Sequence, residues 1–112
     1  MIAEDDQDIL LILNMILNDA GYSVEPLPDG RSIVDRKKDW PDLFILDKDM
    51  PVIDGLAICR YLKLNAATKD IPIIMISAFH YLKGRAKQAG VNEFIEKYLD
   101  FKPESNGINS LV

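Results

Sequence analysis

The aspartate at position 47 stands at the end of a short apolar run and just before a turn. Residues 43–46 read Leu-Phe-Ile-Leu, a run typical of a buried strand. Pro51 and Gly55 then indicate a loop. In open α/β sheets, ligands bind at the rim formed by the carboxyl ends of the strands. Asp47 is therefore a candidate acceptor of a phosphoryl group, the role that carboxylate nucleophiles play in phosphoaspartyl chemistry.

Three other apolar runs end in the same way, each before polar residues. Residues 1–3 lead into Glu4, Asp5 and Asp6, residues 73–76 lead into Ser77, and residues 93–96 lead into Lys97. If these strands are parallel, the polar side chains gather at one rim, where clustered carboxylates raise one another's pKa and need a cation. Oxygen ligands of this kind suit Mg²⁺. A lysine and a serine beside the cation suit a bound phosphoryl group.

The composition bounds what the chain can do. Its 112 residues, 48% of them hydrophobic, suit one domain with a real core. The net charge of −5 and the lack of a block of like charge argue against direct binding to nucleic acid. The apolar stretch at 9–17 is too short to span a bilayer, so no membrane association is expected. The single cysteine, Cys59, excludes an internal disulfide and fits a reducing, cytoplasmic location.

Strand and helix patterns alternate along the chain. We expect strands over residues 1–3, 22–25, 43–46, 73–76 and 93–96, and helices over residues 7–20, 31–38, 56–64 and 81–89. A last, weak helix is expected from Pro103. Gly21 should end the first helix and Asp29 should cap the second. This alternation predicts an α/β fold with a five-stranded parallel sheet and helices on both faces. Right-handed crossovers favour the flavodoxin-like strand order 2-1-3-4-5.

Taken together, these residues resemble a response regulator receiver domain, the phosphoacceptor module of two-component signalling. The resemblance covers essentially the whole chain, which we interpret as one domain over residues 1–112. Its most specific parts are the acidic residues 4–6 and the segment Leu46-Asp47-x-x-Met50-Pro51-x-x-Asp54-Gly55. Its other parts are Ile71-Pro72 with the strand that follows, Ser77-Ala78, Ala89-Gly90, Phe94 and Lys97.

The resemblance implies a magnesium site beside the phosphoacceptor Asp47. Asp5 would bind Mg²⁺ directly, and Glu4 would act directly or through water. Asp49 stands where the backbone carbonyl binds the metal, and Asp6 would be more peripheral.

The resemblance also implies how a phosphoryl group is held and how it is sensed. Ser77 would donate a hydrogen bond to the group and Lys97 would pair with it. Phe94 would turn inward when Ser77 moves, so Ser77 and Phe94 form the switch. Tyr98 replaces the proline that follows the lysine in the family.

The function implied is that of a phosphoacceptor in a His-Asp phosphorelay. A sensor histidine kinase or a histidine phosphotransfer protein would donate the phosphoryl group, and conformation would be the output. The domain would promote its own phosphorylation and dephosphorylation without being a turnover enzyme. The resemblance also allows a homodimer through the face formed by the helix at 81–89, the strand at 93–96 and the last helix.

Two alternatives remain open from the sequence. Asp47-Lys48-Asp49 has the Asp-x-Asp pattern of haloacid-dehalogenase-like phosphatases, although that motif belongs on a first strand and this one follows the third. An interaction module that keeps the fold without phosphorylation is the other alternative, because Tyr98 and the weak last helix depart from the family pattern.

Overall fold

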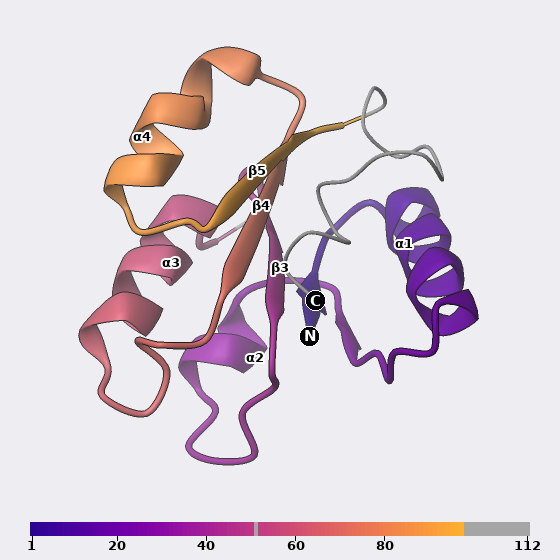
Figure 1. Ribbon diagram of the computed structural model, residues 1–112, viewed down its shortest axis with the longest axis horizontal. Helices are drawn as coiled ribbons and strands as arrows, with labels where there is room; N and C mark the ends of the chain where they lie inside the picture. The colour runs from indigo at the N-terminus through magenta and orange to yellow at the C-terminus, as the bar shows by residue number, and fades with distance from the viewer. Residues whose placement is uncertain (51, 98–112) are drawn as a thin grey trace.

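The computed structural model describes residues 1–50 and 52–97, which form a five-stranded parallel sheet (Figure 1). The strand order is β2-β1-β3-β4-β5, so the predicted order 2-1-3-4-5 is confirmed. The strands are β1 (Ile2–Ala3), β2 (Pro26–Leu27), β3 (Phe44–Asp47), β4 (Ile73–Ser77) and β5 (Glu93–Glu96). The helices are α1 (Gln7–Asp19), α2 (Arg31–Val34), α3 (Gly55–Leu64) and α4 (Lys83–Gln88), with a 3₁₀ turn at His80–Leu82.

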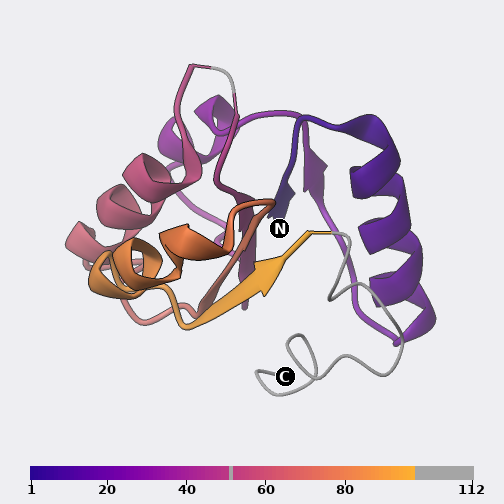
Figure 2. The ribbon, with the colours of Figure 1, turned by 90° about the horizontal axis from the view of Figure 1, so that it is seen from above.

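Helices cover both faces of the sheet. Helix α1 lies alone on one face among the described elements, and α2, α3 and α4 lie on the other (Figures 1 and 2). Two buried clusters follow from this layering. The cluster under α1 contains Leu13, Ile45 and Ile74, and the cluster on the other face contains Phe44 and Met75. None of the described helices is long and apolar enough to cross a membrane.

The first helix begins and ends where its flanking residues predict. The side chain of Asp6 accepts hydrogen bonds from the backbone N–H groups of Asp8 and Ile9, which satisfies two free donors at the helix start. Gly21 follows the last turn with a φ of +94°, a left-handed conformation that glycine adopts without steric cost. Asp6 is thus a capping residue of α1.

The second strand and the second helix differ from the expected positions. Strand β2 is at Pro26–Leu27 and not at 22–25, since Pro26 pairs in register with Ile2 on the edge of the sheet. Proline is tolerated at the first position of an edge strand. Helix α2 ends at Val34 and not at residue 38, because only Ile33 of its residues is buried and little packing would stabilise a further turn.

The cap of α2 also differs from the expectation. Gly30 holds the N-cap position, and the Asp29 carboxylate accepts a hydrogen bond from the backbone N–H of Arg31 at 2.9 Å. A Cβ atom at Gly30 would clash with Ile58 of α3, so the close packing of α2 on α3 requires glycine there.

The last two described helical elements are shorter than the expected helix over residues 81–89. The segment forms a 3₁₀ turn and then six residues of α-helix, Lys83–Gln88. Gly84 lies in the first turn of α4, where glycine is a poor helix former. The expected helix from Pro103 and the Lys97–Tyr98 bond lie outside the described residues.

Candidate functional site

Strand alternation places three charged residues on the same side of the sheet at its carboxyl edge. Glu4, Asp47 and Lys97 each stand two positions after an isoleucine of the cluster under α1. Those isoleucines are Ile2, Ile45 and Ile95. Because side chains two residues apart on a strand point to the same face, the three charged groups converge.

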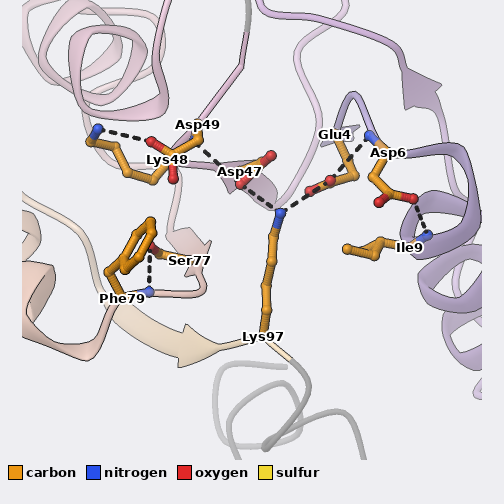
Figure 3. Close-up of polar contacts among 9 residues, drawn as sticks. All are labelled: Glu4, Asp6, Ile9, Asp47, Lys48, Asp49, Ser77, Phe79 and Lys97. Atoms are coloured by element: carbon orange, nitrogen blue, oxygen red, sulfur yellow. Dashed lines mark hydrogen bonds and ion pairs between the residues drawn. The ribbon is translucent and has the colours of Figure 1, made fainter.

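Lys97 bridges the two buried carboxylates. Its Nζ lies 3.0 Å from Oδ1 of Asp47 and 3.2 Å from Oε1 of Glu4 (Figure 3). The side chains of Glu4 and Asp47 are 0% and 1% exposed, and that of Lys97 is 11% exposed. One ammonium group therefore offsets two carboxylates that are out of contact with water.

This burial shifts the pKa of each group. Burial and the nearby Glu4 carboxylate raise the pKa of Asp47 to about 7, although Lys97 opposes the shift. Burial also raises the pKa of Glu4 against the opposing effect of Lys97. For Lys97, burial favours the neutral amine, but Asp47 and Glu4 outweigh it and raise the pKa. The site thus holds excess negative charge at a cost.

A third carboxylate completes a set that fits a divalent cation. Oxygen atoms of Glu4, Asp5 and Asp47 lie within 4.8 Å of one another. Oε2 of Glu4 and Oδ2 of Asp47 are buried and have no hydrogen-bond partner among the described residues. Buried acceptors of this kind need a partner, and an all-oxygen donor set favours Mg²⁺. Three carboxylates against one ammonium leave the charge that such a cation would neutralise.

Asp49 contributes its backbone close to Asp47, while its side chain turns outward. Its backbone N–H donates to Oδ1 of Asp47 at 3.3 Å. Its carboxylate lies 3.2 Å from Nζ of Lys48 (Figure 3). The same Nζ lies 3.9 Å from Oδ2 of Asp54. The ion pairs of Lys48 with Asp49 and Asp54 were not predicted from the sequence, in which Lys48 only separates two aspartates.

Ser77 is buried on the neighbouring strand, one position beyond the partner of Asp47. The register pairs Asp47 with Ile76, so Ser77 belongs to the opposite face of the sheet, with Met75. Its hydroxyl oxygen accepts a hydrogen bond from the backbone N–H of Phe79 at 3.1 Å. Ser77 therefore flanks the charged residues without joining the Lys97 bridge (Figure 3).

Phe94 lies away from the charged residues. It pairs in register with Met75, two residues before Ser77, and packs half-buried against the core on the side of α2–α4. Phe94 and Ser77 therefore share one face of neighbouring strands, with the side chain of Phe94 partly inside.

Gly55, which the sequence marks as part of a turn, also has a packing role that the sequence did not reveal. It opens α3, and its backbone N–H donates to the carbonyl of Lys48 at 2.9 Å. A Cβ atom at this position would clash with the backbone carbonyl oxygen of Asp47. The start of α3 therefore packs directly on the strand end that carries Asp47. The Asp54-Gly55 pair signals a turn, but no signal in a single sequence shows this close approach.

Comparison with known proteins identifies the class to which this fold and site belong. Residues 1–104 match the response regulator receiver domain family. The response regulator MprA of Mycolicibacterium vanbaalenii is 34% identical over 100 residues, which cover 87% of this chain and 42% of that protein. The chain spans less than half the length of the first curated relatives that it matches.

Solved structures agree with this match. The chemotaxis response regulator CheY4 of Vibrio cholerae has a TM-score of 0.85 at 28% identity, covering 98% of this chain and 92% of that one. The receiver domain of a signal transduction histidine kinase from Syntrophus aciditrophicus has a TM-score of 0.76 at 31% identity, covering 89% and 78%. The chain belongs to the response regulator receiver domain family, whose fold is the flavodoxin-like sheet described above.

Proposed function

We propose that this domain is a phosphoacceptor in a His-Asp phosphorelay and that Asp47 is the residue phosphorylated. The observation that carries the proposal is the buried Oδ2 of Asp47, which has no partner among the described residues, while Lys97 and the Asp49 N–H hold Oδ1. One oxygen is thus held and the other is left as a nucleophile.

The chemistry is transfer of a phosphoryl group from a phosphohistidine. Oδ2 of Asp47 forms the new O–P bond, the P–N bond of the donor breaks, and its electron pair stays on the imidazole. Lys97 balances charge on the carboxylate and on the transferred group. The Ser77 hydroxyl accepts from the N–H of Phe79 and keeps its own O–H to donate to a phosphoryl oxygen. The protein supplies position and charge neutralisation, the main needs of phosphoryl transfer.

Glu4, Asp5 and Asp47 would hold Mg²⁺, together with the backbone carbonyl of Asp49. The cation supplies charge neutralisation on the phosphoryl oxygens. The residues fit it, because all the donors are oxygens and the buried Oε2 of Glu4 has no partner among the described residues.

The output is a change of conformation. The family is a signalling family and not one of turnover enzymes in the ordinary sense. We infer that Ser77 and Phe94 form the switch, since they lie on the same face of neighbouring strands. Phosphorylation would shift the balance between two states of this face. A homodimer through α4, β5 and the segment beyond it is a further part of the proposal.

The donors are a sensor histidine kinase or a histidine phosphotransfer protein, acting in the cytoplasm on a domain that extends over residues 1–112. Neither alternative from the sequence is favoured by an observation here. The Asp49 carboxylate pairs with Lys48, outside the bridge that joins Lys97 to Asp47, which does not suit a general acid.

The donor class is tested by phosphotransfer from radiolabelled, autophosphorylated histidine kinases. We expect label to pass to this domain when Mg²⁺ is present and to stay on the kinase when EDTA is added. Absence of transfer from every kinase and every phosphotransfer protein of the source organism would contradict the proposal. A Lys37→Met variant, altered at an exposed cation remote from Asp47, is the control and should accept label normally.

A further inference from the structure

Charge is strongly segregated along this chain. Residues 1–54 carry thirteen acidic and five basic side chains, whereas residues 55–92 carry six basic ones and a single acid, Asp70. The basic segment contains α3 and α4, which lie side by side on one face of the sheet (Figures 1 and 2). A protein with a net charge of −5 therefore presents one cationic region.

A cleft between these two helices concentrates the cations. It has a volume of about 470 Å³ and is lined by Arg60, Lys63, Leu64, Arg85, Gln88 and Ala89. Cys59 ties the two helices together beside it, since its Sγ donates to the carbonyl of Ala89 at 3.2 Å. The cleft is thus built on a fixed contact between α3 and α4.

Three cationic side chains line the cleft, and hydrogen bonds to nearby carbonyls explain the position of one of them, Lys63. Nζ of Lys63 donates to the carbonyls of Lys69 and Ile71 at 3.1 and 3.2 Å, which joins α3 to the segment that leads into β4. The side chains of Arg60 and Arg85 are exposed, and neither side chain makes a hydrogen bond or an ion pair within the described part of the chain. Two guanidinium groups therefore line the cleft without a partner among residues 1–50 and 52–97.

An apolar side chain stands beside these cations. Leu64 is 88% exposed, the highest value among the large hydrophobic residues described. An isolated exposed leucine needs no explanation, but this one lines the same cleft as Arg60 and Arg85. The combination suits a ligand that carries both carboxylates and an apolar group.

We infer that the cleft between α3 and α4 is a docking site for an acidic peptide segment of a partner protein, with carboxylates on Arg60 and Arg85 and an apolar side chain on Leu64. Arginine pairs with carboxylates through two parallel hydrogen bonds. The overall negative charge and the exposed leucine favour a polypeptide over a nucleic acid. This inference goes beyond the phosphoacceptor role and does not depend on it.

The test selects ligands from a displayed library of random dodecapeptides with the wild-type domain as target and measures their affinity by fluorescence anisotropy. We expect enrichment of peptides that combine Asp or Glu with Leu, Ile or Phe. Amide shifts of the labelled domain on titration should be centred on residues 60–64 and 85–89. Enrichment without acidic residues, or shifts centred elsewhere, would overturn the inference.

Charge reversal tests whether Arg60 and Arg85 bind the peptide. Arg60→Glu/Arg85→Glu should weaken binding of the selected peptides by about tenfold or more. Lys37→Glu/Lys38→Glu makes the same change of charge at exposed cations outside the cleft and should weaken it by no more than about twofold. Equal losses of affinity in the two variants would show that only the net charge of the domain matters, and would overturn the assignment of the binding site to the cleft. Leu64→Ser should also weaken binding.

Two further measurements make the result decisive. Phosphorylation of the charge-reversed variant by acetyl phosphate at the wild-type rate would show that the variant is folded and that the cleft is separate from the Asp47 site. A single-stranded oligonucleotide of matched length should bind far more weakly than the selected peptides. Binding of the oligonucleotide at the cleft with equal affinity would overturn the assignment to a peptide.

Discussion

Nζ of Lys97 lies 3.0 Å from Oδ1 of Asp47, and the other oxygen of that carboxylate is buried without a partner among the described residues. The lysine comes from the end of β5 and the aspartate from the end of β3, with β4 between them. Their contact is therefore a product of the strand order, and it lowers the pKa of Asp47 against the larger effects of burial and Glu4.

Removal of the Lys97 ammonium should raise the pKa of Asp47 above its value of about 7. The reason is that an opposite charge within hydrogen-bond distance favours the ionised carboxylate, by about one pKa unit or more. We expect this shift in Lys97→Met, measured by carbon NMR of the aspartate carboxyl groups in EDTA. Lys48→Met should leave this pKa nearly unchanged, since Lys48 pairs with Asp49 and Asp54. An unchanged or lowered pKa in Lys97→Met would contradict this account.

The free energy of unfolding of the metal-free domain should depend on pH because of the raised pKa of Asp47. Its pKa is about 7 in the folded state and about 3.9 in the unfolded state. The stability that this group contributes is therefore fully present below about pH 4 and is lost as the pH rises through about 7. Asp47→Asn lacks this loss and should become more stable than the wild type as the pH increases.

Thermal unfolding in EDTA between about pH 5 and 8 measures this difference. We expect the Tm of Asp47→Asn minus that of the wild type to grow by about 4 °C or more over this range, which corresponds to about 1 kcal/mol. Groups that do not interact with Asp47 cancel in the difference, whereas Glu4 and Lys97 are coupled to it and their response is part of the effect measured. A difference that stays constant or falls with pH would show that Asp47 is not held ionised at a cost.

Asp5 and Asp6 should differ in their effect on Mg²⁺ binding. Asp5 belongs to the set of three carboxylates within 4.8 Å, whereas Asp6 caps α1. Asp5→Asn should weaken Mg²⁺ binding by about tenfold or more, since it removes one of the few anionic ligands of a hard cation. Asp6→Asn keeps a good capping residue and should leave the affinity nearly unchanged. Isothermal titration at fixed pH provides both affinities, and equal losses would refute the ligand assignment.

The backbone of Val52, in the loop after β3, should be strained in a way that a substitution can relieve. Its φ is +72° and its side chain is 74% exposed. A β-branched residue is disfavoured in this conformation, whereas asparagine tolerates it. Val52→Asn should therefore raise the free energy of unfolding by about 1 kcal/mol. Val52→Ile keeps the strain and should change it little. Chemical denaturation of both variants checks this, and a loss of stability in Val52→Asn would be the contrary result.

Much of the fold was predictable because the strands are short, apolar and buried. The runs before Asp47 and Ser77 mark strands β3 and β4, and alternation along β1, β3 and β5 brings Glu4, Asp47 and Lys97 together. The strand order 2-1-3-4-5 was predicted from the alternation of strands and helices and is confirmed.

The less buried elements were predicted less well. Strand β2 is an edge strand of two residues, so its position depends on pairing with Ile2 and leaves a weak pattern in the sequence. Helix α2 has one buried residue, Ile33, so little packing stabilises it and its length leaves a weak pattern in the sequence. Tertiary contacts of this kind are absent from local periodicity.

The same limit applies to the candidate site. The convergence of the charged side chains could be predicted, but the partners that they have in this structure could not. The bridge from Lys97 to Glu4, the pairing of Lys48 with Asp49 and the bond from Phe79 to Ser77 all depend on loop geometry. The packing of Gly55 on the Asp47 carbonyl depends on how α3 leaves the sheet.

The central claim is that Asp47 accepts a phosphoryl group in a Mg²⁺-dependent step. Its most direct test is intact-mass and peptide-mass measurement after incubation with acetyl phosphate, with Mg²⁺ or with EDTA. We predict one added phosphoryl group with Mg²⁺, located on Asp47, little or none with EDTA, and none on Asp47→Asn. A phosphoryl group on another residue of the wild type, or no modification of the wild type in Mg²⁺, would contradict the account.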